Sequence, residues 1–203
     1  MKKFMVMVAV AMMTAMNVNA QSDEPKNEIS ISYGAGCLST IGDGLGNAIG
    51  NGIFDQLVGC EWKDSKAFGS IGVEYFRHLD NPRLAVGGIV TFASFGEDVV
   101  KKNGGAKVGE RTRNYISLMP SVKYYWVNGK NFGFYSKAAV GATMLIDKRN
   151  DNESNQSSTG SKLFFTGQVS PIGLEAGSTN VRAFMEAGFG EQGILLAGLR
   201  MKF

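Results

Sequence analysis

Histidine is almost absent from this chain, since His78 is the only one among 203 residues. This count excludes a histidine-rich metal site and leaves any histidine-dependent catalysis to one side chain. Cysteine is nearly as rare, with Cys37 and Cys60 alone. Long apolar runs are missing too. After the first twenty residues, no stretch approaches the roughly 18 uninterrupted apolar residues of a membrane-spanning helix.

The first twenty residues have the pattern of a cleaved export signal. Two lysines precede the almost entirely apolar run Phe4–Met16, and Val18-Asn19-Ala20 places small residues where a signal peptidase reads the chain. A membrane-anchoring helix is the alternative, but the apolar run is too short for one. We therefore predict a signal peptide at residues 1–20, cleavage before Gln21, and a single domain over residues 21–203.

The mature chain also lacks a strong excess of either charge. Removing the two signal lysines from the 21 basic residues leaves 19, against 18 acidic ones. Without a basic stripe or a run of like charges, nothing indicates a nucleic-acid or polyelectrolyte partner.

Alternation with a period of two residues runs through most of the remaining sequence. The end of the chain shows it clearly, because apolar Leu195, Leu199 and Phe203 share one side of a strand, and Arg200 and Lys202 share the other. Reading for this period and for turn residues predicts eight strands. They are Glu28–Leu38, Phe68–His78, Arg83–Phe95, Thr112–Trp126, Phe132–Ile146, Lys162–Ala176, Val181–Phe189 and Gly193–Phe203.

The connections between these strands alternate between short and long. Short turns follow the second, fourth and sixth strands, and each contains the Gly, Asn, Asp or Pro that tight turns require. Long polar connections follow the first, third and fifth strands, and only the last connection on that side, Gly190–Gly193, is short. The short turns are Leu79–Pro82, Val127–Asn131 and Gly177–Asn180, and the long connections are Ser39–Ala67, Gly96–Arg111 and Asp147–Ser161.

This asymmetry is typical of transmembrane barrels, which have short periplasmic turns and longer outer loops. Aromatic residues gather near the predicted periplasmic ends, where an interfacial girdle is expected. They are Tyr75, Tyr124, Trp126, Phe132, Phe134 and Phe203. The fold class we predict is all-β, an eight-stranded antiparallel up-and-down transmembrane β-barrel. A soluble, lipocalin-like barrel is the alternative, but it would require large apolar residues at the inward positions, which here include charges and glycines.

Four segments resemble those of the small eight-stranded outer-membrane barrels of the OmpA/OmpX type, in the version common in Gram-negative bacteria of the Bacteroidetes kind. They are Met119–Trp126, Ser170–Glu175, Ala187–Ile194 and Gly198–Phe203. With the strand pattern, the resemblance covers nearly all of residues 28–203. It implies recognition of the last strand, ending at Phe203, by the barrel-assembly machinery, although Met201 replaces the usual penultimate aromatic. The family shares an architecture and no single activity.

Strand parity places six charged residues inside the barrel, three of each sign. They are Glu74, Lys123, Lys137, Glu175, Glu186 and Arg200. Because eight strands enclose a space just wide enough for side chains, these charges should compensate one another. Two interpretations stay open, a polar plug that specifies the barrel and a gate whose ion pairs rearrange to pass ions.

The first long connection contains a stripe of apolar residues spaced four apart, from Ile41 to Leu57, which predicts a short helix with Thr40 as its cap. The glycines of Gly42–Gly52 match no phosphate-binding motif. Cys37 and Cys60 form either a disulfide at the outer end or two separate thiols. The polar segment Asp147–Ser161 is expected to be a mobile loop, and its carboxylates do not follow an EF-hand pattern.

Catalysis has little support in the sequence. His78 lies at the periplasmic end of its strand, away from the outer mouth, and is expected to be an interfacial or pore-mouth histidine. We predict no catalytic, cofactor-binding or metal-binding residue. The expected function is that of a monomeric outer-membrane barrel with a structural or surface-interaction role through its outer loops. The alternatives are a small ion-conducting pore and, more distantly, a lipid-modifying enzyme.

Overall fold

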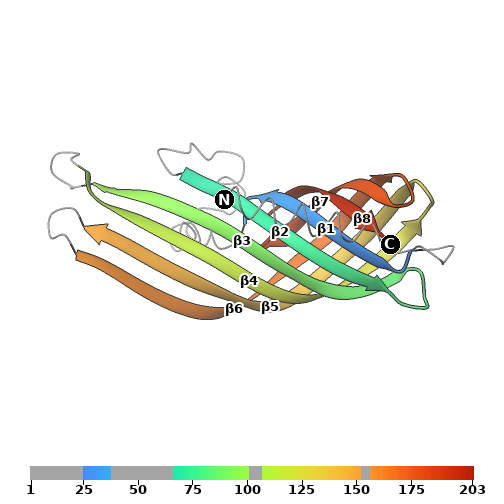
Figure 1. Cartoon of the computed structure of the whole chain (residues 1–203), viewed down its shortest axis with the longest axis horizontal. Coiled ribbons are helices and arrows are strands. Elements are labelled where there is room, and N and C mark those ends of the chain that lie inside the picture. Colours follow the sequence, from blue (N-terminus) through green and yellow to red (C-terminus); the bar gives the residue numbers. More distant parts are fainter. Residues whose placement is uncertain (1–24, 38–65, 101–106, 152–155) are drawn as a thin grey trace, which may run out of the picture.

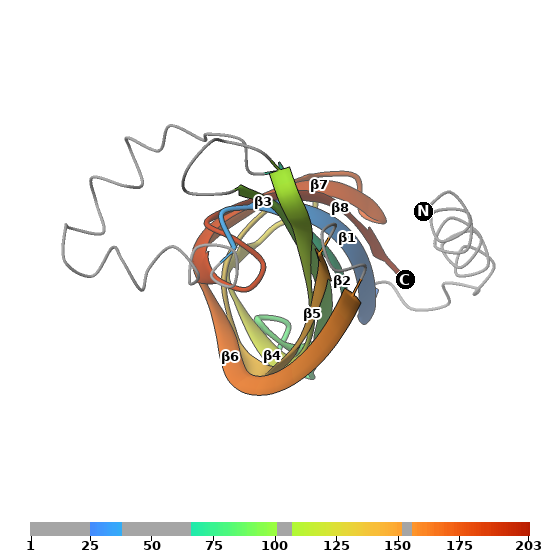
Figure 2. The ribbon, with the colours of Figure 1, turned by 90° about the vertical axis from the view of Figure 1, so that its left-hand side faces the viewer.

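Eight antiparallel strands form a closed barrel in the computed structural model, which describes residues 25–37, 66–100, 107–151 and 156–203 (Figures 1 and 2). Each strand pairs with its neighbours in the chain, and β1 closes the ring on β8. The strands are β1 Asn27–Ala35, β2 Lys66–His78, β3 Leu84–Val100, β4 Lys107–Asn128, β5 Phe132–Asp151, β6 Gln156–Gly177, β7 Val181–Gly190 and β8 Leu195–Lys202. The predicted eight-stranded up-and-down barrel is confirmed.

Side chains alternate between the lumen and the outer surface along each strand. On β8, Leu195 and Leu199 are exposed, while Arg200 and Lys202 are buried inside the barrel. The apolar exterior is extensive, with Leu118 of β4 and Met185 of β7 exposed by 63% and 66%. An exterior this apolar would be unfavourable in water, and it matches the lipid-facing band of a membrane barrel.

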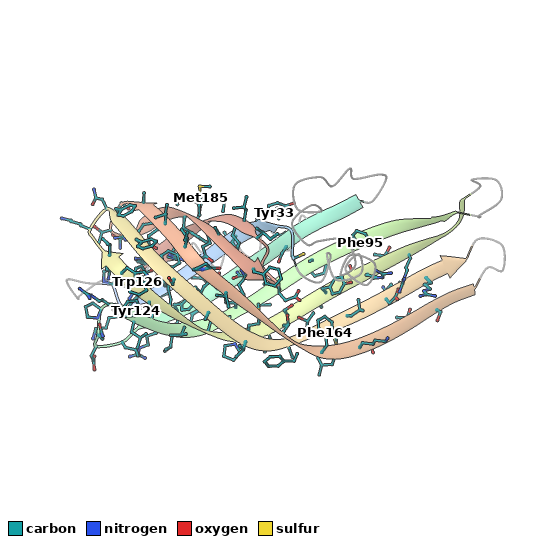
Figure 3. All side chains as sticks on the ribbon, turned by 180° about the vertical axis from the view of Figure 1, so that it is seen from behind. Tyr33, Phe95, Tyr124, Trp126, Phe164 and Met185 are labelled. Atoms are coloured by element: carbon teal, nitrogen blue, oxygen red, sulfur yellow. The ribbon has the colours of Figure 1, made fainter. Side chains whose placement is uncertain are left out.

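Aromatic side chains lie on the exterior near the short turns, which define the end that we call the turn end. Tyr124 and Trp126 of β4 pack edge to face, with ring centroids 4.8 Å apart, and Figure 3 shows both at this end of the sheet. The indole Nε1 of Trp126 donates a hydrogen bond of 2.8 Å to Ser136 on β5. Tyr75 and Phe132 are also exposed here. This placement agrees with the aromatic girdle expected from the sequence.

Strands β3 to β6 are much longer than the others and project beyond the opposite end of the barrel, the extended end (Figure 1). The predicted connections Gly96–Arg111 and Asp147–Ser161 were wrong in this respect, because most of their residues belong to strands. Pairing continues to Val100 opposite Lys107 and to Asp151 opposite Gln156. These segments contain many polar residues and show no clear alternation, although their backbones pair with neighbouring strands.

An ion pair between neighbouring strands stabilises the projecting sheet. The Nε of Arg111 on β4 donates to both carboxylate oxygens of Asp147 on β5, at 2.9 and 3.1 Å. This hydrogen bond lowers the pKa of the Asp147 carboxyl from its ordinary value of 3.8. The predicted mobile loop therefore begins, at Asp147, with an ordered and paired residue.

The helix predicted in the first long connection, between Ile41 and Leu57, lies outside the described residues, as does Cys60. The two alternatives for Cys37 and Cys60, a disulfide or two separate thiols, therefore both stay open. Cys37 lies buried beside Ala93 and Tyr115, just inside the extended end. Within the described ranges, no helix is long and apolar enough to cross a membrane.

Candidate functional site

The lumen is the part of this barrel richest in chemistry. All six charges that strand parity assigned to the interior are buried there, each at 2% exposure or less. They meet further charged and aromatic side chains that were not among these six. Those additional residues are Glu28, Tyr125, Tyr135, Arg182 and Lys202.

Lys137 on β5 holds together two carboxylates from opposite parts of the ring. Its Nζ lies 2.6 Å from Glu74 on β2 and 2.7 Å from Glu186 on β7. The hydroxyl of Tyr135 donates to Glu186 at 2.8 Å, and Ser30 donates to Glu74 at 3.1 Å. Both oxygens of Glu74 and one oxygen of Glu186 accept hydrogen bonds, while the second oxygen of Glu186, Oε2, is buried beside the Lys137 ammonium without a hydrogen bond.

Arg200 on β8 occupies the centre of the network. Its guanidinium forms an ion pair with Glu175, and lies 3.5 Å from Glu28 and 3.8 Å from Glu74. Lys123 on β4 pairs with Glu28 on β1. A single planar cation with several donors therefore connects carboxylates from β1, β2 and β6, a geometry that lysine could not reproduce.

Aromatic rings line the space between these charges. The Nζ of Lys123 lies 3.9 Å from the ring centroid of Phe76, and the Arg200 guanidinium lies 4.5 Å from that of Phe184. Such contacts favour a cation that has lost its water. Phe76 also belongs to an apolar lumen cluster on the β2–β5 side, together with Ala85, Ile89, Met119 and Ala139. The interior is therefore part charged and part apolar.

His78, the only histidine, lies in the mouth of the lumen at the turn end and is 8% exposed. Its Nε2 is 3.2 Å from a carboxylate oxygen of Glu28, and its ring lies 5.4 Å from that of Tyr125. The expectation of a pore-mouth histidine is confirmed, and Glu28 is its acidic neighbour. Within the described strands and turns, no group of three or more His, Cys, Asp or Glu residues could hold a metal ion.

The connection between β7 and β8 enters the lumen from the extended end. The short connection predicted at Gly190–Gly193 is confirmed as a turn, and it is buried, with Glu191 and Gln192 exposed by 2% and 1%. The side-chain amide of Gln192 donates to Glu74 at 2.7 Å, and its backbone N–H donates to Gln168 at 2.9 Å. Figure 2 looks along the barrel from this end, with the connection in red. The connection lies over the charged network. We call this connection the plug, as distinct from the polar plug that the charged side chains form.

A glycine makes room for this plug. A Cβ added to Gly34 on β1 would lie 1.7 Å from the carbonyl oxygen of Gln192, a distance too short for any side chain at this position. The backbone of the connection can therefore reach the wall of the barrel only because this position has no side chain. Sequence alternation cannot reveal this role, since it depends on a segment more than 150 residues away.

Arg182 on β7 is the residue that ties the turn end together, and sequence reasoning missed it. Its guanidinium donates to the backbone oxygens of Gly129 and Lys130 at 2.9 and 2.8 Å, and to that of Ser178 at 3.2 Å. A further donor reaches Glu175 at 2.6 Å. Two turns and the buried network are joined through one side chain. Its inward parity on a strand next to a turn was the available signal.

A closed antiparallel barrel with ion pairs inside and apolar side chains outside has the inside-out pattern of a membrane protein. We therefore assign the chain to the class of eight-stranded transmembrane β-barrels. The architecture that the sequence resemblance implied is confirmed by the closed β1–β8 order.

Two solved barrels are similar to this chain at low identity. The attachment invasion locus protein Ail of Yersinia pestis matches with a TM-score of 0.44 and 15% identity, over 88% of this chain and 95% of that one. The N-terminal β-barrel domain of Pseudomonas aeruginosa OprF matches with a TM-score of 0.43 and 14% identity, over 89% and 98%. No family model and no curated protein sequence matches the chain. The class assignment accordingly depends on the chain's own pairing and charge distribution.

The shared cation Lys137 provides a first test of the network. Lys137→Ala leaves Glu74 and Glu186 buried near each other, and breaking such a pair costs about 3–5 kcal/mol of unfolding free energy. Glu186→Ala should lower the free energy of unfolding by less, because Lys137 keeps its ion pair with Glu74. Leu199 faces outward and is 58% exposed. Leu199→Ala should lower the free energy of unfolding by about 1–3 kcal/mol. Urea titration of the refolded barrel measures the order, and near-neutral Lys137→Ala would mean that water reaches the lumen.

The plug provides a second test. Gly34→Val should expel the β7–β8 connection, so that the amides of Gln192 and Ile194, which donate to Gln168 and Ala35, lose hydrogen-exchange protection. The midpoint of urea unfolding should fall as well. Gly160→Val is the matched control, because a Cβ there meets nothing within 4 Å. Unchanged protection at Gln192 in Gly34→Val would show that the connection does not depend on this glycine.

Proposed function

We propose that this chain is an integral protein of the outer membrane, exported with cleavage before Gln21, whose role is structural or surface-interacting and involves no catalysis. In this proposal it is a monomer, and its last strand, ending at Phe203, is read by the barrel-assembly machinery. The turn end faces the periplasm and the extended end faces outward, because short turns mark the periplasmic side of such barrels.

The packing of the lumen supports a barrel that does not conduct ions. Arg200, Lys123 and Lys137 are buried at 2% exposure or less, so these side chains in the middle of the barrel are shielded from water. The inserted Gln192 covers the same region from the extended end. These observations favour the polar plug over the gate, and they make the small pore the weaker interpretation.

One observation carries the surface-interaction role: the projecting part of β6 has an unpaired edge. Pairing between β6 and β7 starts at Gln168, whereas β6 itself begins at Gln156. Between them, β6 pairs with β5 on one side, and among the described residues no strand pairs with its other side. Such an edge presents free backbone donors and acceptors, which can add an extended segment of another protein. We propose that this edge is where the barrel meets its surface partner.

Location and orientation are tested on intact cells. N-terminal sequencing of the protein from the outer-membrane fraction should give Gln21 as the first residue. Trypsin added to whole cells should cut at Lys148, Arg149 or Lys162 and should spare Lys130 in the β4–β5 turn. An intact Met1 in the inner membrane would overturn the export proposal, and cleavage at Lys130 in unbroken cells would reverse the orientation.

The partner-binding edge is tested by shortening the β5–β6 hairpin. Replacing residues 146–161 with an Asn-Gly turn joins Leu145 to its cross-strand partner Lys162 and removes residues 156–161, the outer half of the unpaired edge. The shortened barrel should keep its urea midpoint, since the membrane part is unchanged, and should lose the adducts that chemical cross-linking produces on intact cells. A shortened form that cross-links like the wild type contradicts the edge. Single-channel recording accompanies the test, and steady conductance by the wild type would move the pore interpretation ahead.

A further inference from the structure

A pocket of about 590 Å³ opens at the turn end, opposite the projecting sheet. Its walls are the three tight turns, the residues before β1 and the end of β8. Backbone hydrogen bonds hold this rim in place: His78 N–H donates to Lys26 at 2.7 Å, Gly177 N–H to Asn131 at 3.0 Å, and Lys202 N–H to Asn180 at 2.7 Å. The volume falls within the range of about 300–1,000 Å³ typical of small-molecule sites.

Positive charge dominates the lining of this pocket. Lys26 and Lys130 are exposed on its rim, and Arg182 and Lys202 are buried at its floor. Asp80 is the acidic residue of the lining, and its carboxylate lies 4.0 Å from Lys26 with both side chains largely in water. The lining therefore carries four cationic side chains against one carboxylate.

The floor carries more positive than negative charge. Glu175 is the carboxylate nearest to Lys202 and Arg182, at 2.6 Å from each, and it also pairs with Arg200. Glu28, the cross-strand partner of Lys202, is a second carboxylate at this depth and pairs with Lys123 and Arg200, so two carboxylates face four cations. The donors of Arg182 are directed at Glu175 and at the backbone of the rim. The Lys202 ammonium has three N–H donors, and Glu175 is its hydrogen-bond acceptor among the described residues.

We propose that this pocket binds a small oxyanion that carries two or more negative charges on phosphate or carboxylate groups. Lys202 binds it at the floor, Lys26 and Lys130 bind it at the rim, and Arg182 contributes positive field while holding the turns. The low-dielectric walls of the barrel concentrate that field, as in other clefts lined by one sign of charge. Neutral sugars and cations gain nothing from this lining. The proposal is independent of the surface-interaction role, and in the orientation proposed above the pocket opens to the periplasm.

The test measures binding to the refolded mature barrel in detergent micelles by isothermal titration calorimetry, with inorganic pyrophosphate and citrate as separate probes. One saturable site is expected, with an affinity that falls as salt rises. Lys26→Gln combined with Lys130→Gln should weaken binding at least about tenfold, because two charge-assisted contacts are lost. Both rim lysines are exposed, so the barrel should fold, which the urea midpoint checks. Binding of one probe alone assigns the pocket to phosphate or to carboxylate.

Lys148→Gln combined with Lys162→Gln is the matched control, since it removes the same charge from exposed positions at the extended end. This control should leave the affinity within about twofold, which is under 0.5 kcal/mol. An equal loss in both double variants would mean that only net charge matters, and would overturn the pocket. Absence of binding at millimolar probe would overturn it too. So would binding that appears only after Asp23→Asn and Glu24→Gln, because the chain's own carboxylates would then be the occupants.

Discussion

Closure of the ring between the first and last strands is the constraint on which this structure depends. Asn27 and Phe203 exchange two backbone hydrogen bonds, of 2.9 and 2.8 Å, and the β1–β8 pairing continues to Ala35 opposite Leu195. In a bilayer no water satisfies an open strand edge, so a sheet can span it only as a closed ring. With eight strands, the enclosed space is just wide enough for side chains. The lumen must therefore be filled, and whatever fills it must satisfy its own charges.

The charged residues, rather than the apolar ones, determine which face of each strand lines the lumen. Both surfaces of this barrel carry apolar residues, since Ile89 and Met119 lie in the lumen while Leu118 and Leu199 face outward. A one-residue slip in register would move every side chain to the opposite face. It would place Lys123 and Lys137 in lipid, where a charged side chain is costly. Replacing such a network with apolar residues can leave stability unchanged, but in this barrel it would remove the signal that fixes the register.

Alternation predicted the membrane part of the fold because each strand there has lipid on one side and the lumen on the other. The six inward charges followed from the same parity, and all are buried as expected. The projecting ends escaped prediction because both faces meet water there, as the exposed Ser158, Thr159 and Lys162 show. The burial of Gln192 could not be predicted from the sequence for a different reason. Its burial depends on the space left by Gly34 on a strand distant in sequence, and a local pattern carries no such information.

A filled lumen leaves the two ends of the barrel as the places where specific contacts can form, and the two ends differ in kind. Beyond the membrane, water satisfies unpaired backbone groups, so β6 can carry an edge with which none of the described strands pairs, and which would be too costly a few residues further along the strand. At the turn end, backbone hydrogen bonds hold the turns in place, and cations outnumber carboxylates, since Glu175 alone pairs with three of them. The extended end therefore offers hydrogen bonds to a chain, and the turn end offers a positive field to an anion. Both properties follow from the narrow ring of eight strands between them.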